Sequence, residues 1–466
     1  MRVVSHSRAR TRRFGIHPTV AILCFCVIFS SVRPVVLAQK PTAPVEATPV
    51  PVREEFRFGK VDLELFEQVV LLDRRFEKEG AILEDAATNA YLSRIGQLLL
   101  PKDLVIENVT WKFRVLRDPQ PNAFALPNGS IYVTTGLIGL LDNESQLAAV
   151  LAHEITHVTR RHSYVHNRSN RKKFLTMNIM AAAGAYAPAG AVGGAILLAT
   201  TIAPFIVVAS MFGYSRDLER EADHRAIDMM ITAEYPPEEV IGALKLLGND
   251  IEGEQIKLFY NDHPELQERI KYLSSYLGAR ADKLTPQMVL NKEKKRYFGQ
   301  FESVMRHNVQ LAINAGRFRS AVYFAERLVE FRPESSENLF LLGEAYRTLG
   351  PWARQLTDRE LSNSAKKDAA KKREKRTLEE QERDLLATPA GQENWKIHQQ
   401  KAEEYYLRAL SLENPFLATH RGLGMLYEKL GRPSEALTHY EKYVGLAPAA
   451  FDRERIQKRI DALRRN

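Results

Sequence analysis

Cysteine is almost absent from this sequence of 466 residues. Only Cys24 and Cys26 are present, and both lie within the first 38 positions. If this segment is removed on export, the remaining chain has no thiol to oxidise, and its fold needs no disulfide. An oxidising compartment outside the cytoplasm is therefore compatible with the chain.

Acidic residues are missing from the same 38 positions, which contain six arginines. The net charge of the whole chain is +9, but without this segment 60 lysines and arginines face 57 acidic residues, which leaves +3. The basic balance therefore comes mostly from the leader. It gives no electrostatic reason to expect a nucleic-acid partner.

Long apolar runs are few, and the first of them is short. Val20–Phe29 has ten residues, about half of what a membrane-spanning helix needs. With a basic start before it and Val36-Leu37-Ala38 after it, this run completes the three-part pattern of a secretory signal peptide at residues 1–38. We expect export to the periplasm or cell envelope, with an uncleaved anchor as the alternative. A proline-rich, flexible linker follows at residues 39–54.

Charge is absent from a second stretch, residues 174–212, which spans 39 positions. Two membrane crossings would need roughly 40 residues before any turn is counted, and glycines and prolines interrupt the stretch. We therefore expect helices that pack on the neighbouring domain or make peripheral contact with a membrane surface. A true transmembrane insertion is the alternative.

What the sequence does contain is a His-Glu-x-x-His motif, within Leu147–Arg160. His153 and His157 are four apart, so on a helix both imidazoles project from one face and can bind one zinc ion at about 2.0–2.1 Å. Glu154 is turned aside from the metal and can accept a proton from a water molecule as the general base. The preceding apolar helix formers favour a buried catalytic helix over a merely structural histidine pair.

Zinc in hydrolytic sites usually has three protein ligands and leaves one position open. One charged segment supplies the candidates for the third ligand: Glu219, Glu221 and His224. Glu219 is favoured because Asp223 shares its helical face and can hydrogen-bond a ligand histidine from behind. Alone, this segment would indicate only a solvated charged helix. His162 follows the motif without the glycine of the metzincin pattern, so that class is disfavoured.

Strand-like sequence precedes the zinc helix. Two helices, beginning near Val61 and Asp85, lead into alternating segments at 109–116 and 122–134. A Pro-Asn-Gly turn inside the second segment predicts a small antiparallel sheet, whose edge could hold an extended substrate peptide. A purely structural sheet is the alternative. The candidate residues for the substrate strand are Asn128, Gly129, Ser130 and Ile131.

The last third of the chain repeats itself. Gly316 and Gly350 are 34 residues apart, which is the tetratricopeptide period. Gly343-x-x-Tyr346 matches Gly424-x-x-Tyr427 in a later copy. Stacked repeats of this kind form a concave face suited to a protein substrate or partner.

One of these repeats is interrupted. Gly350 and Gly431 are 81 residues apart, one period plus 47, so we expect an insertion between the two helices of one repeat. A charged segment near 351–396 fits this insertion, as a solvated helical hairpin or a disordered arm. The second helix should resume with the residues Ala402, Tyr406 and Ala409.

Four motifs combine in this chain: Asn122-Ala-Phe-Ala-Leu-Pro-Asn-Gly, His153-Glu-Ile-Thr-His157, Ser215-Arg-Asp-Leu-Glu219-Arg-Glu-Ala-Asp223 and His263-Pro. Over about residues 56–277 the chain resembles the Ste24-like, or CAAX-prenyl-protease-like, zinc metallopeptidases. With its leader and repeats it is most similar to the branch of periplasmic β-barrel assembly-enhancing proteases.

The resemblance implies roles for individual residues. His153, His157 and Glu219 would bind zinc, Glu154 would be the general base, and Asp223 would support a ligand. His263 would lie in a regulatory loop that approaches the metal; the structural alternative is that Asp262 caps a helix there.

We therefore expect an α+β, mainly α protein. A gluzincin-type zinc metallopeptidase domain at residues 55–285 is followed by a connector at 286–300 and an α-solenoid of repeats at 301–466. The expected function is hydrolysis of peptide bonds in misfolded or misassembled cell-envelope proteins, with one Zn²⁺ as cofactor. The repeats would recruit substrate or the outer-membrane assembly machinery. The alternative is a chaperone or scaffold in envelope assembly whose metal site is blocked or vestigial.

Overall fold

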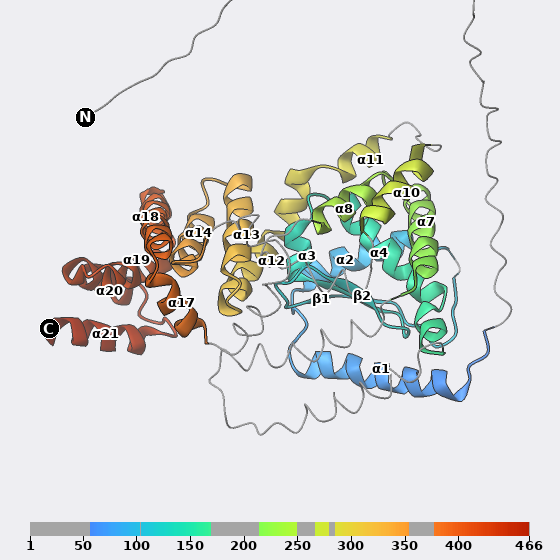
Figure 1. Ribbon diagram of the computed structural model, residues 1–466, viewed down its shortest axis with the longest axis horizontal. Coiled ribbons are helices and arrows are strands. Elements are labelled where there is room, and N and C mark those ends of the chain that lie inside the picture. The colour runs from blue at the N-terminus through green and yellow to red at the C-terminus, as the bar shows by residue number, and fades with distance from the viewer. Residues whose placement is uncertain are drawn as a thin grey trace, which may run out of the picture. The chain divides into compact units, whose positions relative to one another are not determined.

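A computed structural model describes most of the chain from Phe56 onward (Figure 1). The described ranges are 56–102, 104–168, 214–248, 266–278, 285–353 and 377–465. The predicted leader and linker, the uncharged stretch 174–212 and His263 lie outside them. Within the described ranges, no helix is both long enough and apolar enough to cross a membrane.

The sheet has three strands in the order β1-β3-β2: β1 (Lys112–Leu116), β3 (Ser130–Thr134) and β2 (Ala123–Ala125). The predicted turn joins β2 to β3 as an antiparallel hairpin, but β1 runs parallel to β3. The sheet is therefore mixed rather than antiparallel, because β3 returns between its two predecessors. The α+β, mainly α class is confirmed.

The residues predicted for the substrate strand, Asn128 to Ile131, are not at an edge. The amides of Thr110 and Lys112 donate to the carbonyls of Asn128 and Gly129 on one side, and the Leu126 amide donates to the Ser130 carbonyl on the other. The prediction is therefore wrong for these residues. The error arose because the alternating pattern marks a strand but does not give its position in the sheet.

The edges of the sheet belong to β1 and β2. On the outer side of β1, Ile82 forms an antiparallel bridge to Leu116, and the Leu83 amide donates to the Val115 carbonyl. In β2, Phe124 pairs with Tyr132, and the flanking hydrogen bonds join Asn122 and Leu126 to β3. By alternation, the amides and carbonyls of Ala123 and Ala125 point away from β3.

Different helices pack on the two faces of the sheet. Phe76 of α1 (Lys60–Lys78) packs against Phe124 and Tyr132, whereas the alternate residues Ile131 and Val133 join the main apolar core. Figure 1 shows α1 on one side of the sheet, and α2 (Ala86–Leu99) and α4 (Glu144–Thr159) on the other. The metal site therefore belongs to the face opposite α1.

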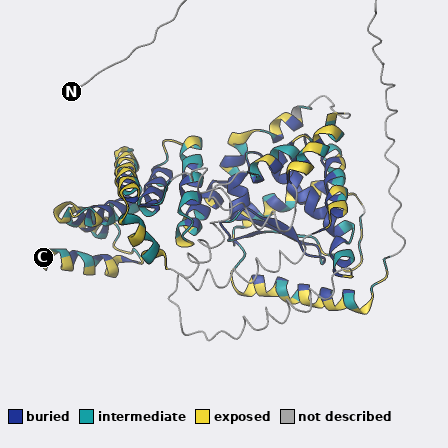
Figure 2. Ribbon diagram, in the orientation of Figure 1, coloured by how far each residue is buried: buried dark blue, intermediate teal, exposed yellow. Residues whose placement is uncertain are grey.

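The motif helix α4 is buried over almost its full length (Figure 2). Every residue from Glu144 to Val158 is buried. The Asn143 side chain caps the helix by accepting from the Gln146 amide at 2.9 Å. A helix that is covered on all sides gives its side chains a fixed surrounding, which a metal site requires.

Beyond the sheet domain, helices pack in consecutive pairs. Two pairs have the spacing expected of repeats: α12 (Lys294–Asn314) with α13 (Phe318–Phe331), and α19 (Ala418–Lys429) with α20 (Pro433–Leu446). The capping helix is α21 (Arg453–Arg465). The connector predicted at 286–300 is helical, with α11 (Pro286–Asn291) and the first residues of α12.

The interrupted repeat pairs α14 (Ser336–Leu349) with α18 (Pro389–Ser411), and these two helices pack closely. A Cβ atom on Gly343 would approach the Tyr406 ring to 2.7 Å, so the glycine makes room for the tyrosine. Of the insertion, residues 354–376 lie outside the described ranges, and α17 (Leu378–Leu386) forms its last part. The residues predicted to resume the second helix, Ala402, Tyr406 and Ala409, are all buried in α18.

The first repeat is bonded to the segment that leads into α4. The short helix α3 (Thr135–Leu140) connects β3 to this segment. The Tyr297 hydroxyl donates to the Ile138 carbonyl at 2.9 Å, and the Arg327 guanidinium donates to the Leu141 carbonyl at 2.9 Å. Thr135 also donates to the Asn308 side chain at 2.9 Å. The repeats and the sheet domain consequently share one continuous apolar core.

The β2–β3 turn offers a test of the fold. Gly129 has φ +94°, and a Cβ atom there would lie 2.7 Å from the Thr110 carbonyl oxygen. Gly129→Ala is expected to cost about 1–2 kcal/mol for the backbone conformation and a further ~1–3 kcal/mol for the contact. Gly80→Ala is the control, because Gly80 has φ +66° but nothing within 4 Å of its Cβ position. Equal losses in chemical denaturation would contradict the close contact at Gly129.

Candidate metal centre

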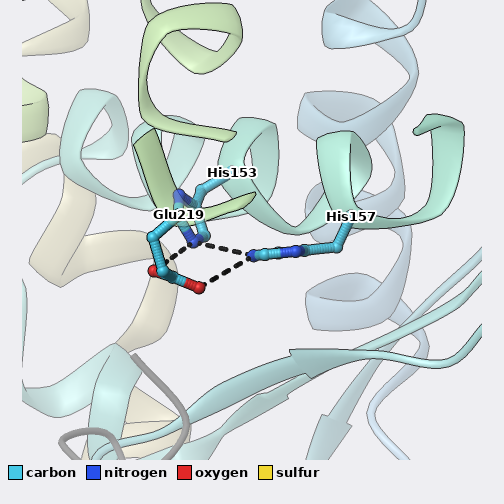
Figure 3. A group of neighbouring side chains, drawn as sticks. All are labelled: His153, His157 and Glu219. Carbon is cyan, nitrogen blue, oxygen red and sulfur yellow. Dashed lines mark hydrogen bonds and ion pairs between the residues drawn. The ribbon is translucent and has the colours of Figure 1, made fainter. Parts of the chain in front are cut away.

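Three buried side chains from two helices converge on one point (Figure 3). His153 and His157 project from α4, and their Nε2 atoms are 3.0 Å apart. Glu219 comes from α7 (Arg216–Thr232), and its two carboxylate oxygens lie 3.5 Å from the Nε2 atoms of His153 and His157. All three donor atoms fall within 4.8 Å of one another.

The donor set fits a zinc ion. Two imidazole nitrogens and one carboxylate form the His₂Glu set of hydrolytic zinc sites, which leaves the fourth position for water or substrate. The Nδ1 atoms of both histidines are engaged elsewhere, His153 with Asp223 and His157 with His162. The Nε2 atoms are therefore the ones presented to a metal.

The directions of the three candidate side chains on α7 show which of them can be the third ligand. Glu219 faces α4, whereas Glu221 pairs with Arg160 through a short contact, and the His224 ring stacks on Tyr276 at 4.2 Å between centroids. Because helix positions two and five residues on from Glu219 point in other directions, only Glu219 reaches the two histidines. The predicted choice of Glu219 agrees with this geometry.

Asp223 lies directly behind His153, as the spacing predicts. Its Oδ1 atom is 3.0 Å from His153 Nδ1, so the carboxylate holds the ring with Nε2 toward the metal. Burial alone would lower the pKa of His153, but the charge of Glu219 and the hydrogen bonds that His153 donates to Asp223 and Glu219 outweigh it and raise this pKa to about 9. The metal-free site therefore holds a proton at neutral pH, which a zinc ion must displace.

Arg269, on α10 (Leu266–Gly278), balances the carboxylates. Its guanidinium makes two bonds to Asp223, of 2.9 Å from Nε and 2.6 Å from Nη2, and its Nη1 atom lies 3.1 Å from Glu219 Oε2. Tyr272 of the same helix also donates to Asp223. Burial would raise the pKa of Asp223, but Arg269 and His153 hold it well below its usual range. No local sequence signal marks Arg269, because its partners lie 46 and 50 positions upstream.

His157 has a different surrounding. The Tyr214 ring lies nearly parallel to its ring, 3.8 Å between centroids and 13° between planes, and the Tyr214 hydroxyl is 2.9 Å from Ser163 Oγ. His162 is on the other side, with Nδ1 2.9 Å from His157 Nδ1. Sequence reasoning considered His162 only as a third ligand of another class, and the structure places it behind a ligand instead.

Glu154 occupies the position expected of a base. It follows His153 on the buried helix α4, and only 1% of its surface is exposed. Its orientation relative to the ligands is set by helix geometry, about 100° around the axis from His153. The remaining predicted site residue, His263, lies outside the described residues, and its regulatory role stays a prediction.

Two histidines one turn apart on a buried helix, completed by a glutamate from a second helix, form the donor set that is typical of zinc metallopeptidases with a His₂Glu site. Residues 86–277 match the model of Peptidase family M48. This part of the chain is therefore similar in sequence to that family. Residues 422–449 match the model of the tetratricopeptide repeat, in agreement with the predicted period.

Comparison with curated proteins gives the same class. Over 49% of its length the chain is 29% identical to the mitochondrial metalloendopeptidase OMA1 of Schizosaccharomyces pombe, covering 66% of that protein. It is 27% identical to a putative β-barrel assembly-enhancing protease of Vibrio cholerae, over 47% of this chain and 43% of that protein. It is 25% identical to the β-barrel assembly-enhancing protease of Escherichia coli K12, over 49% of this chain and 47% of that protein. The chain thus spans less than two thirds of each of these relatives.

Proposed function

We propose that this protein is a zinc-dependent endopeptidase that cleaves peptide bonds in exported proteins. The observation that carries the proposal is the convergence of His153, His157 and Glu219 within 4.8 Å on a buried helix pair. A zinc ion bound there supplies electrophilic polarisation of the scissile carbonyl and makes water a better acid. The chain's own residues supply the binding geometry and the proton transfer.

Proton transfer is assigned to Glu154. Its carboxylate accepts the proton of the attacking water and then passes it to the amine that leaves when the peptide bond breaks. Asp223 and Arg269 keep His153 and Glu219 in place during this exchange, since both are buried and hydrogen-bonded.

Substrate binding is assigned to the edge of β2 instead of the residues first predicted. Ala123 is 0% and Ala125 3% exposed, so an extended peptide would pair with their outward amides and carbonyls by strand addition only after the residues that cover this edge move aside. β2 also packs against α4. A peptide paired with this edge would therefore lie beside the helix that carries the histidines.

The physiological role proposed is quality control of cell-envelope proteins. Three features support it: the leader pattern at residues 1–38, the helical repeats, and similarity to proteins named β-barrel assembly-enhancing protease. The repeats would recruit a protein substrate or the outer-membrane assembly machinery. The uncharged residues 174–212 would make peripheral membrane contact.

A direct test combines metal analysis with digestion of an unfolded protein. The purified chain is expected to contain close to one zinc ion and to cleave casein. A chelator should abolish cleavage, and added zinc should restore it, because the metal is required for each turnover. A metal-loaded, folded chain that does not cleave casein or other unfolded proteins would contradict the endopeptidase assignment.

A further inference from the structure

The position of His162 depends on an unusual backbone turn. Helix α4 ends at Thr159, and Arg161 then adopts φ +58°, a left-handed conformation that is rare for a residue with a side chain. Such a conformation costs on the order of 1–2 kcal/mol. It turns the chain back so that His162, with no exposed surface, meets the rear of His157. The strained backbone conformation of Arg161 thus places His162 behind His157.

A carboxylate lies next to the other nitrogen of His162. Its Nε2 atom lies 3.4 Å from Glu221 Oε2, on α7. The other oxygen of Glu221 accepts a short hydrogen bond from Arg160, and Arg225 approaches it at 3.5 Å. Because guanidinium groups only donate, Glu221 lies in this contact as a carboxylate, which accepts hydrogen bonds.

These contacts fix the order of donors and acceptors. Because Glu221 only accepts, a neutral His162 carries its hydrogen on Nε2, and its Nδ1 atom is then an acceptor. The Nδ1 atom of His157, 2.9 Å away, must then be a donor. A neutral imidazole with its hydrogen on Nδ1 has its lone pair on Nε2, the atom that faces His153 and Glu219.

One ligand histidine thus contacts a carboxylate directly, and the other is connected to a carboxylate through a further histidine. His153 meets Asp223 directly, at 3.0 Å, whereas His157 meets Glu221 only through His162. Asp223 places a negative charge directly behind one ligand. The second ligand has the His162 imidazole behind it, so the carboxylate of Glu221 lies one residue further from the metal.

We propose that His162 and Glu221 are positioning residues of the metal centre: they fix the tautomer and ring orientation of His157 and so raise zinc affinity without binding the ion. This inference rests on the metal site of the proposed function but not on peptide cleavage. A chain that binds zinc and cleaves nothing would defeat the proposed function and leave this inference intact.

The first test compares two variants of His162 in the full chain. His162→Phe keeps an aromatic ring but leaves the His157 donor without an acceptor. Since such partners of ligands typically contribute 10–100-fold to metal affinity, the zinc dissociation constant should rise by about that factor. His162→Asn places an amide oxygen near the original Nδ1 position and should stay within about threefold of the unmodified protein. A competition assay with a chromophoric chelator measures each constant.

The second test does not depend on how well a phenylalanine packs. In Glu221→Gln the amide oxygen must face Arg160, which only donates, so the amide NH₂ faces His162. This reverses the donor order and leaves the hydrogen of His157 on Nε2, the metal-binding atom. Zinc affinity should fall at least tenfold, and the visible spectrum of the cobalt-loaded protein should lose intensity. Asp217→Asn, an exposed position on the same helix, is the control and should match the unmodified protein.

The outcomes separate positioning from packing. If His162→Phe and Glu221→Gln both bind zinc within twofold of the control while only the melting temperature falls, the proposal is overturned. If His162→Phe does not fold, Glu221→Gln alone decides, because it preserves the shape of the side chain. Weaker zinc binding in both variants, with a circular dichroism spectrum unchanged and affinity recovered in His162→Asn, supports the proposal.

Discussion

Replacing Glu154 by glutamine is expected to lower the rate of casein cleavage by about 10²–10⁴-fold, the usual contribution of a general base, while zinc stays bound. Glutamine has nearly the same shape but cannot accept the proton of the attacking water. Because Glu154 is not one of the three converging donors, metal content should not change. Cleavage is measured with purified, zinc-analysed protein.

The control for this variant is Glu268→Gln, at an exposed position on α10, which should cleave normally. Cleavage by Glu154→Gln at the rate of that control would remove the base mechanism. The same variant separates the enzyme from the scaffold alternative in cells. If a strain that lacks the protein is fully rescued by Glu154→Gln, the repeats rather than the peptidase site carry the function.

Arg269→Ala is expected to destabilise the metal-free protein by about 3–5 kcal/mol, the usual cost of leaving a buried charge without its partner. The substitution removes both bonds to Asp223 and the contact with Glu219, so the positive charge of the protonated His153 alone would face two buried carboxylates. Zinc binding should reduce the loss, because the ion supplies positive charge next to Glu219. Urea denaturation with and without chelator measures both values.

An exposed ion pair provides the comparison. Arg75 contacts Glu79 at 2.6 Å on the surface of α1, and Arg75→Ala should cost no more than about 1 kcal/mol. Adding Asp223→Asn to Arg269→Ala should recover part of the lost stability, since it removes one of the unbalanced charges. Equal effects of Arg269→Ala and Arg75→Ala would show that the buried network contributes little.

The sequence was sufficient for the ligands because their spacing is local. His153 and His157 are one helical turn apart, and Glu219 with Asp223 repeats that spacing on a second helix. Helix geometry alone then places each pair on one face. The contacts of Arg269, Tyr214 and His162 with the ligands could not be predicted, because each depends on how separate segments pack.

The fold shows the same division. Caps, the β2–β3 turn and the 34-residue period are local signals, and the structure agrees with them at Asn143, Gly129 and Gly316–Gly350. The order of strands is not local: nothing in the alternation at 130–134 indicates that this segment inserts between two others. Assigning the peptide-binding edge to residues 128–131 failed for that reason.

The bonds between the first repeat and the segment before α4 affect how the two halves of the molecule respond to a ligand. Tyr297 and Arg327 hold the carbonyls of Ile138 and Leu141, and Leu141 is two residues before Asn143, the cap of the motif helix. A protein that bends or rotates the first repeat on docking would pull on the start of the helix that carries both histidines. Occupancy of the repeats would then alter metal geometry without any contact at the metal.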